Sequence, residues 1–172
     1  MTVPLMDVSG RVIGFTARII EKDENSPKYL NTPETILYNK GRHIFGLSQA
    51  KDAIRRTDFV VVVEGNMDVI SLHQAGFNYA VAPLGTAFTS EQVNLLARYT
   101  KEIVLMLDAD AAGQKAIKRA TQLLENTGLE VKVDYADNTT QKITAVDLVI
   151  GTIDTSAYGK KPLAISYKGY EI

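Results

Sequence analysis

The sequence predicts an α/β protein in which a parallel sheet is flanked by helices and preceded by a small basic α+β segment. Two observations predict this fold class. Residues 59–63 form a short apolar run of phenylalanine and valines, which is typical of a buried parallel strand. From there to residue 133, strand-like apolar runs alternate with helix-like stretches. Such an alternation predicts parallel strands joined by right-handed helical crossovers.

The amino-terminal segment, residues 1–57, has weaker patterns. Residues 11–20 alternate weakly and predict a strand, the polar stretch 21–27 ends in proline and predicts a loop, and residues 47–56 predict a short helix. The segment carries nine Lys and Arg against six Asp and Glu, a net charge of +3, whereas residues 58–172 carry ten against fourteen, a net charge of −4. Ordinary surface scatter explains this asymmetry if charge alone is considered.

The alternating region predicts the elements of the sheet in turn. Thr89 and Gln92 have the spacing of a capping box, which predicts a helix that begins there and runs to Tyr99. The other predicted elements are a helix over 67–75 ended by Gly76, a strand over 79–82, a strand over 103–107, a helix over 111–126 and a strand over 129–133. Residues 135–172 show no firm period and are predicted only as an unassigned extension.

Length and composition exclude several classes of protein. The 172 residues predict one compact domain or one domain with a small appendage. A net charge of −1 argues against binding of polyanions through bulk charge, and zero cysteines exclude disulfides, thiolate zinc sites and thiol nucleophiles. No apolar run approaches the roughly 20 residues of a membrane-spanning helix. We therefore expect a cytoplasmic protein without membrane contact.

Carboxylates follow two of the predicted strands at the point where each strand ends. Glu64 and Asp68 come after the first strand, and Asp108 and Asp110 come after the third. Ligands of open α/β sheets bind beyond the carboxyl ends of the strands, so these four side chains are expected at one edge. Crowded carboxylates repel each other, and a divalent cation removes that cost. Hard oxygen ligands favour Mg²⁺ or Mn²⁺ over zinc.

A helix cap is the competing explanation of an acid at such a junction, and for a single Asp it is the more common one. Two separate pairs reverse that preference. The residues by themselves therefore predict a Mg²⁺ site that acts on a phosphate-bearing substrate. Weaker candidates are interpreted as packing, turn or solvated surface residues: His43, His73, the glycine turn 84–86, Lys115, Lys118 and Arg119. Lys28, Lys40 and Arg42 could pair with phosphates, although three exposed cations alone are weak evidence of this.

Longer strings of residues resemble the Toprim-containing catalytic core of bacterial replicative DNA primases. Glu64-Gly65 with Asp68, followed by Asp108-Ala-Asp110, is similar to the Toprim signature shared by primases, topoisomerases and related nucleases. The strings that narrow the resemblance to primases are Arg11-Val-Ile-Gly-Phe15, Pro27-Lys-Tyr-Leu-Asn31, Pro33-Glu-Thr35, Lys40-Gly-Arg42, Val63-Glu-Gly-Asn-Met-Asp-Val69, His73-Gln-Ala-Gly76, Leu84-Gly-Thr86 and Asp108-Ala-Asp-Ala-Ala-Gly113.

The resemblance implies a DNA-directed RNA polymerase, a nucleotidyltransferase that makes RNA primers for replication from ribonucleoside triphosphates on a single-stranded DNA template. It implies that two or more Mg²⁺ or Mn²⁺ ions are held by Glu64, Asp108 and Asp110, with Asp68 in the same catalytic cluster. Nucleotide and template would be bound by Lys28, Tyr29, Asn31 and Lys40. It also implies a division into a partial amino-terminal basic subdomain (1–57), a Toprim domain (58–134) and the unassigned extension (135–172).

The sequence departs from the family pattern in three ways. Position 66 is Asn where the family usually has Tyr, and the acidic string expected after the fourth strand is replaced by Asp137-Asn-Thr-Thr-Gln-Lys142. The chain also lacks the cysteine-bearing zinc ribbon, so no zinc is expected, and a replicative helicase would be contacted only through a domain absent here. We expect metal binding to be retained and primer synthesis by the chain alone to be weak. The alternatives are a stand-alone Toprim phosphodiesterase or nuclease and a non-catalytic Toprim binding module.

Overall fold

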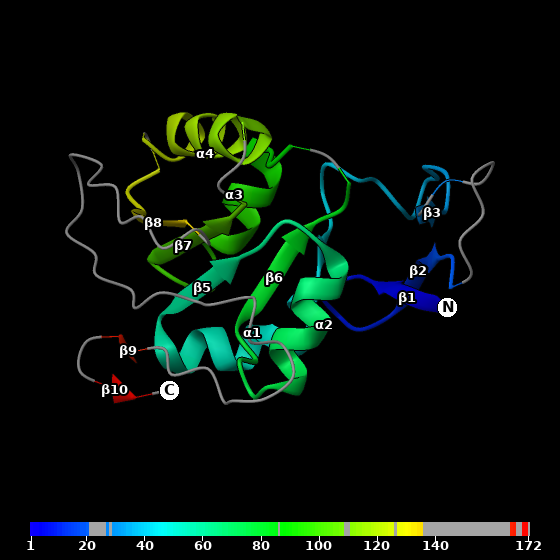
Figure 1. The fold of residues 1–172 in the computed structure, drawn as a ribbon, viewed down its shortest axis with the longest axis horizontal. Coiled ribbons are helices and arrows are strands. Elements are labelled where there is room, and N and C mark those ends of the chain that lie inside the picture. Colours follow the sequence, from blue (N-terminus) through cyan, green and yellow to red (C-terminus); the bar gives the residue numbers. More distant parts are fainter. Residues whose placement is uncertain are drawn as a thin grey trace.

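A computed structural model describes residues 1–20, 27, 29–85, 87–108, 111–125, 127–135, 166–167 and 170–171. Helices lie on both faces of a central sheet, and a small separate sheet lies at the amino-terminal end (Figure 1). The elements in chain order are β1 (Thr2–Met6), β2 (Val12–Arg18), β3 (Tyr29–Asn31), β4 (Ile44–Phe45), α1 (Leu47–Thr57), β5 (Phe59–Val62), α2 (Asn66–Gln74), β6 (Ala80–Pro83), α3 (Ser90–Leu96), β7 (Glu102–Leu107), α4 (Ala111–Leu124), β8 (Glu130–Tyr135), β9 (Ser166–Tyr167) and β10 (Tyr170–Glu171).

The central sheet has five strands in the order β4-β6-β5-β7-β8. β5 is parallel to both β6 and β7, and β8 is parallel to β7, which confirms the predicted parallel α/β sheet. β4 runs antiparallel to β6 at the edge and was not predicted, because a strand of two residues carries no readable period. α2 lies on one face of the sheet and α3 and α4 lie on the other (Figure 1).

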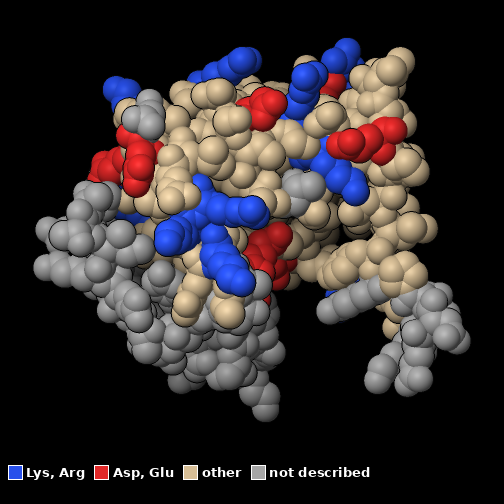
Figure 2. Space-filling model, turned by 90° about the horizontal axis from the view of Figure 1, so that it is seen from above, with Lys and Arg blue, Asp and Glu red and all other residues tan. Residues whose placement is uncertain are grey.

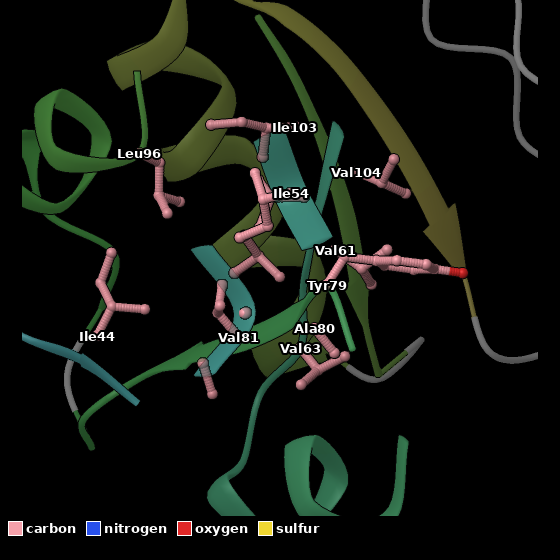
Figure 3. Close-up of a cluster of buried hydrophobic side chains, with 14 of the residues drawn as sticks. Ile44, Ile54, Val61, Val63, Tyr79, Ala80, Val81, Leu96, Ile103 and Val104 are labelled. Atoms are coloured by element: carbon pink, nitrogen blue, oxygen red, sulfur yellow. The ribbon is translucent and has the colours of Figure 1, made fainter. Parts of the chain in front are cut away.

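The core lies between the sheet and these helices. Every residue of β5 is buried, as expected for a parallel strand covered on both faces. The buried cluster joins side chains of β5, β6 and β7 to Leu47, Ala50 and Ile54 of α1. Figure 3 shows Ile54 among the buried side chains of the sheet. Residues 44–57, which the predicted division assigns to the amino-terminal subdomain, therefore pack on the central sheet. The division itself remains a prediction.

The predicted helices are present with small changes at their ends. The capping box of α3 is confirmed: the Thr89 hydroxyl accepts a hydrogen bond from the Gln92 N–H at 3.2 Å, and the Gln92 side chain accepts one from the Thr89 N–H at 3.1 Å. α3 ends at Leu96, three residues before the predicted end. No helix among the described residues is long and apolar enough to span a membrane.

The small sheet has the strand order β1-β2-β3, with antiparallel pairing throughout. Only the strand over 11–20 was predicted there, and β2 is shorter, at 12–18. The small sheet is joined to the rest by a second buried cluster of Leu5, Tyr38 and Leu84, with Ile13 and Phe45 against it. β8 continues two residues past the predicted end, and residues 136–165 of the unassigned extension lie outside the described residues.

Candidate metal centre and nucleic-acid interface

The topology brings the ends of β5 and β7 together. These strands are separated in the chain by β6 but are neighbours in the sheet, with Val62 opposite Leu105. β5 continues into α2 on one face, whereas β7 continues into α4 on the other (Figure 1). Adjacent parallel strands whose connections leave to opposite faces open a crevice at their carboxyl ends, which is where ligands bind in such sheets.

Glu64 and Asp108 stand at this crevice. Glu64 follows the end of β5 by two residues, and Asp108 directly follows β7. The backbone N–H of Asp108 donates a hydrogen bond to Oε1 of Glu64, at 3.0 Å. This bond orients one carboxylate oxygen of Glu64 towards the Asp108 loop. Both residues remain exposed, so their carboxylates are accessible to a ligand.

Asp68 lies on the first turn of α2 beside this pair. The Gly65 N–H donates a hydrogen bond to Asp68 Oδ2 at 3.0 Å, so the carboxylate caps its own helix. Desolvation is the largest influence on the pKa of Asp68 and raises it. The Gly65 hydrogen bond lowers this pKa, while the nearby charge of Asp108 raises it further. Asp68 is therefore both a helix cap and an electrostatic neighbour of Asp108.

Gly113 permits the close approach of α4 to the two acids. The glycine is buried, and a Cβ at this position would overlap the carbonyl oxygen of Asp108 and stand 3.1 Å from Glu64 Oε1. A larger residue would therefore displace the loop after β7 or the helix. The string from Asp108 to Gly113 is part of the family resemblance seen in the sequence, but the close approach itself depends on the folded backbone.

These side chains carry oxygen atoms of the kind that a divalent cation needs as ligands. Carboxylate oxygens are the ligands that Mg²⁺ and Mn²⁺ prefer, and the repulsion between Asp68 and Asp108 is of the kind that a cation relieves. Within the described part of the chain, no group of three His, Cys, Asp or Glu side chains is arranged to hold a metal. Asp110, the third predicted ligand, lies outside the described residues.

The predicted nucleotide and template residues are divided between β3 and a turn. Tyr29 and Asn31 lie on β3, where the Arg18 guanidinium is 5.8 Å from the centre of the Tyr29 ring. The Asn31 Nδ2 atom lies 3.4 Å from the position of a Cβ at Gly85, the second residue after β6. β3 is therefore close to the carboxyl end of the central sheet. Lys28 lies outside the described residues.

Lys40 and Arg42 lie on a turn at the same edge as the acids. The turn leads into β4, and Ile44 is opposite Pro83, the last residue of β6. Because β4 is antiparallel to β6, the residues that precede Ile44 extend beyond the carboxyl end of β6. Two strand spacings separate β4 from β5, or roughly 10 Å. Sequence reasoning missed this placement because β4 was not visible in the pattern.

The basic residues of α4 lie on a solvated surface and the two histidines bond to backbone carbonyls, as their sequence interpretations expected. Figure 2, which views the molecule from the side of α4, shows a group of basic side chains next to an acidic patch. Lys115, Lys118 and Arg119 are exposed on α4. His73 hydrogen-bonds through Nε2 to the Ala80 carbonyl, and His43 through Nδ1 to the Asn39 carbonyl, each at 2.9 Å, so both serve packing.

Two family models match the chain. The fold and the acids at the ends of β5 and β7 define a Toprim-type domain, and the model described as Toprim-like matches residues 61–142. The model described as the amino-terminal domain of the DNA primase catalytic core matches residues 1–51. Together the two matches take in both the small sheet and the central sheet.

Individual relatives narrow this class. The DNA primase of Aquifex aeolicus is 45% identical over 135 residues, which are 78% of this chain and 27% of that protein. A crystal structure of the zinc-binding and RNA polymerase domains of Aquifex aeolicus primase has a TM-score of 0.74 at 45% identity, covering 78% of this chain and 33% of that one. A DnaG primase catalytic domain bound to single-stranded DNA has a TM-score of 0.71 at 39% identity, covering 78% and 44%.

The chain belongs to the bacterial DNA primase family and corresponds to part of its catalytic core. It spans 27% of the length of the Aquifex aeolicus relative and 19% of that of Synechococcus elongatus.

Proposed function

We propose that this chain carries the metal-dependent nucleotidyl-transfer site of a primase, which synthesises RNA primers on single-stranded DNA. The observation that carries the proposal is the hydrogen bond from the Asp108 N–H to Glu64 Oε1, because it joins acids from two neighbouring strands at the crevice of the sheet. Relatives at 45% identity are DNA primases, and this supports the same activity here.

In this proposal Glu64, Asp108 and Asp110 hold Mg²⁺ or Mn²⁺, and Asp68 belongs to the same cluster. When bound, such ions supply electrostatic stabilisation of the phosphate charge in an in-line displacement. The chain's own residues bind and orient. The Asp108 N–H holds the Glu64 carboxylate in place, and Gly113 allows α4 to pack beside it. No protein nucleophile is required.

Lys28, Tyr29, Asn31 and Lys40 are proposed to bind nucleotide and template. The turn at Lys40 lies on the same edge of the sheet as the acids. Such contacts recognise the DNA backbone without reading bases, so binding of single-stranded DNA should weaken steeply with salt. Ribonucleoside triphosphates are the proposed second substrate.

Metal binding is the first test. Mg²⁺ at 100 times its Kd should stabilise the folded chain by about 2.7 kcal/mol, seen as a rise in the melting temperature. Asp108→Asn should abolish that rise. Asp52→Asn is the matched control, since it removes the same charge from an exposed position on α1. A response to Mg²⁺ that is equal in Asp108→Asn and in the unchanged chain would contradict the site.

The reaction is tested separately. The chain is incubated with single-stranded DNA and Mn²⁺, with and without ribonucleotides, and the products are separated by size. Ribonucleotide incorporation that is weak and depends on Glu64 and Asp108 is the expected result. Cleavage of the DNA without incorporation would support a Toprim phosphodiesterase instead, and an absence of saturable metal binding would support a non-catalytic module.

A further inference from the structure

Gln92 does more than cap its own helix. Its side chain is fully buried, at 0% exposure, although it is polar. The Nε2 group donates two hydrogen bonds out of α3, to the carbonyls of Lys40 at 2.9 Å and His43 at 2.8 Å. Thr89 adds a third, from its hydroxyl to the Gly41 carbonyl at 2.6 Å. The start of α3 therefore binds three carbonyls of the turn of residues 39–43, the basic turn that carries Lys40 and Arg42.

The capping role does not require these donors. A capping box needs only an acceptor on the third residue of the helix, and Gln92 supplies it through Oε1, which accepts the Thr89 N–H. The two amide hydrogens of Gln92 are both used on the turn. Glutamate would serve the cap equally well but has no hydrogen to donate when ionised. The choice of Gln at this position is thus explained by the turn and not by the helix.

The turn itself behaves as one unit. The N–H groups of Arg42 and His43 both donate to the Asn39 carbonyl, at 3.1 and 3.2 Å, and the Gly41 N–H donates to Asn39 Oδ1 at 2.9 Å. Its internal shape is set locally, and its position is held by the pairing of β4 with β6, by a bond from the Lys40 N–H to Glu34, and by the bonds to α3. The turn carries Lys40 and the exposed Arg42 at the edge of the sheet that also bears Glu64.

We propose that Gln92 is a positioning residue for the DNA backbone: it anchors the turn of residues 39–43 to α3 so that Lys40 and Arg42 hold phosphates beside the acidic site. The choice of DNA as the ligand rests on the proposed function, whereas the anchoring of the turn to α3 does not depend on it. The two parts can therefore be tested by different measurements on the whole chain.

Gln92→Glu separates anchoring from capping, because it keeps the acceptor for Thr89 and removes both donors. Hydrogen exchange of a peptide covering residues 38–45 should become faster, while that of α4 stays unchanged. Binding of a labelled single-stranded DNA oligonucleotide should weaken about fivefold at 0.1 M salt for each phosphate that the turn no longer neutralises. The slope of log affinity against log salt should become shallower by about 0.7 for each such phosphate.

Asn94→Asp is the matched control. It makes the same change of charge on the same helix at an exposed position, and we expect no change in exchange and little change in DNA affinity. Mg²⁺ binding, measured by calorimetry, should be the same in both variants. An equal reduction of DNA affinity in Gln92→Glu and Asn94→Asp would show a general charge effect and overturn the positioning role.

A second variant tests the part of the proposal that does not depend on the folding of Gln92→Glu, namely that the cations of the turn bind phosphates. Lys40→Gln combined with Arg42→Gln changes only the cations of the turn and should reduce the salt slope by the same amount. In a folded triple variant with Gln92→Glu, no further reduction should appear, because the three changes act through one binding surface. Unchanged exchange in Gln92→Glu would overturn the anchoring. If Gln92→Glu exchanges faster but the unchanged chain binds no DNA, the anchoring of the turn stands and the proposed function fails.

Discussion

Two opposing sets of interactions act on the pKa of Asp68. Its carboxylate caps α2 through the Gly65 N–H, which favours the ionised form, while desolvation and the charge of Asp108 favour the protonated form. Desolvation is the largest of these influences, and the pKa lies above its ordinary value of 3.8. The folded chain without metal therefore carries an ionised Asp68 at a cost in stability.

Asp68→Asn should raise the melting temperature of the metal-free chain at neutral pH. The raised pKa means that the cost is present above the folded-state pKa and disappears below 3.8, where the group is protonated in both folded and unfolded chains. The gain should therefore shrink as the pH falls towards 3.8. Asn retains an acceptor for the Gly65 N–H, so the cap survives.

Thermal unfolding between pH 3 and 8 in the presence of a chelator measures this effect. Asp52→Asn, at an exposed position on α1, controls for the change in net charge. A loss of stability in Asp68→Asn at every pH would show that the cap outweighs the repulsion.

At the scale of elements, α4 packs against the ends of two strands. Gly113 lies in its first turn and costs the helix about 1 kcal/mol relative to Ala in propensity. The glycine is required because a Cβ would overlap the Asp108 carbonyl oxygen. Its backbone φ is not positive, so space rather than backbone conformation explains the residue. A weaker helix is thus accepted where the helix approaches the acids.

Gly113→Ala should weaken Mg²⁺ binding by about 10- to 100-fold, because supporting residues around a metal site have effects of this size. The loop after β7 must move to accept the methyl group, and the Glu64–Asp108 hydrogen bond moves with it. Calorimetric titration with Mg²⁺ measures the affinity. Lys118→Ala, on the exposed side of α4, should leave it unchanged. An unchanged Mg²⁺ affinity in a folded Gly113→Ala chain would contradict the requirement for glycine at this position.

At the scale of the whole molecule, one core unites parts of the chain that composition separates. α1 belongs to the basic amino-terminal segment, yet its buried side chains contact the same cluster as β5, β6 and β7. The amino-terminal sheet contacts this body through a smaller cluster around Leu5, Tyr38 and Leu84. Packing therefore groups α1 with the central sheet.

Ile54→Ala tests this grouping. Ile54 is fully buried, and its truncation should lower the free energy of unfolding by about 2–5 kcal/mol. The loss should appear in the unfolding transition of the central sheet, monitored by denaturant titration. Leu30→Ala, on β3, removes a side chain that is 65% exposed and should change stability by less than about 0.5 kcal/mol. Similar effects of the two substitutions would argue against the shared core.

Elements with a clear period were predicted well, and short ones were not. The apolar run that became β5 and the capping box of α3 were readable because burial and capping leave a local record in the sequence. β1, β3 and β4 were missed, since strands of five, three and two residues are defined mainly by their partners. Gln92 was recognised as a cap, but its bonds to the turn join residues 49 and 52 positions apart.

The sequence by itself determined which residues follow each strand, and hence that acids would gather at the carboxyl edge of a parallel sheet. Periodicity records burial along the chain, so it yields the elements in order. Only the tertiary structure decided that β5 and β7 are neighbours, which joins Glu64 to Asp108 across 44 residues. It also decided that an antiparallel β4 carries the basic turn to the same edge. The lateral order of strands depends on crossovers and long-range packing, which no local pattern contains.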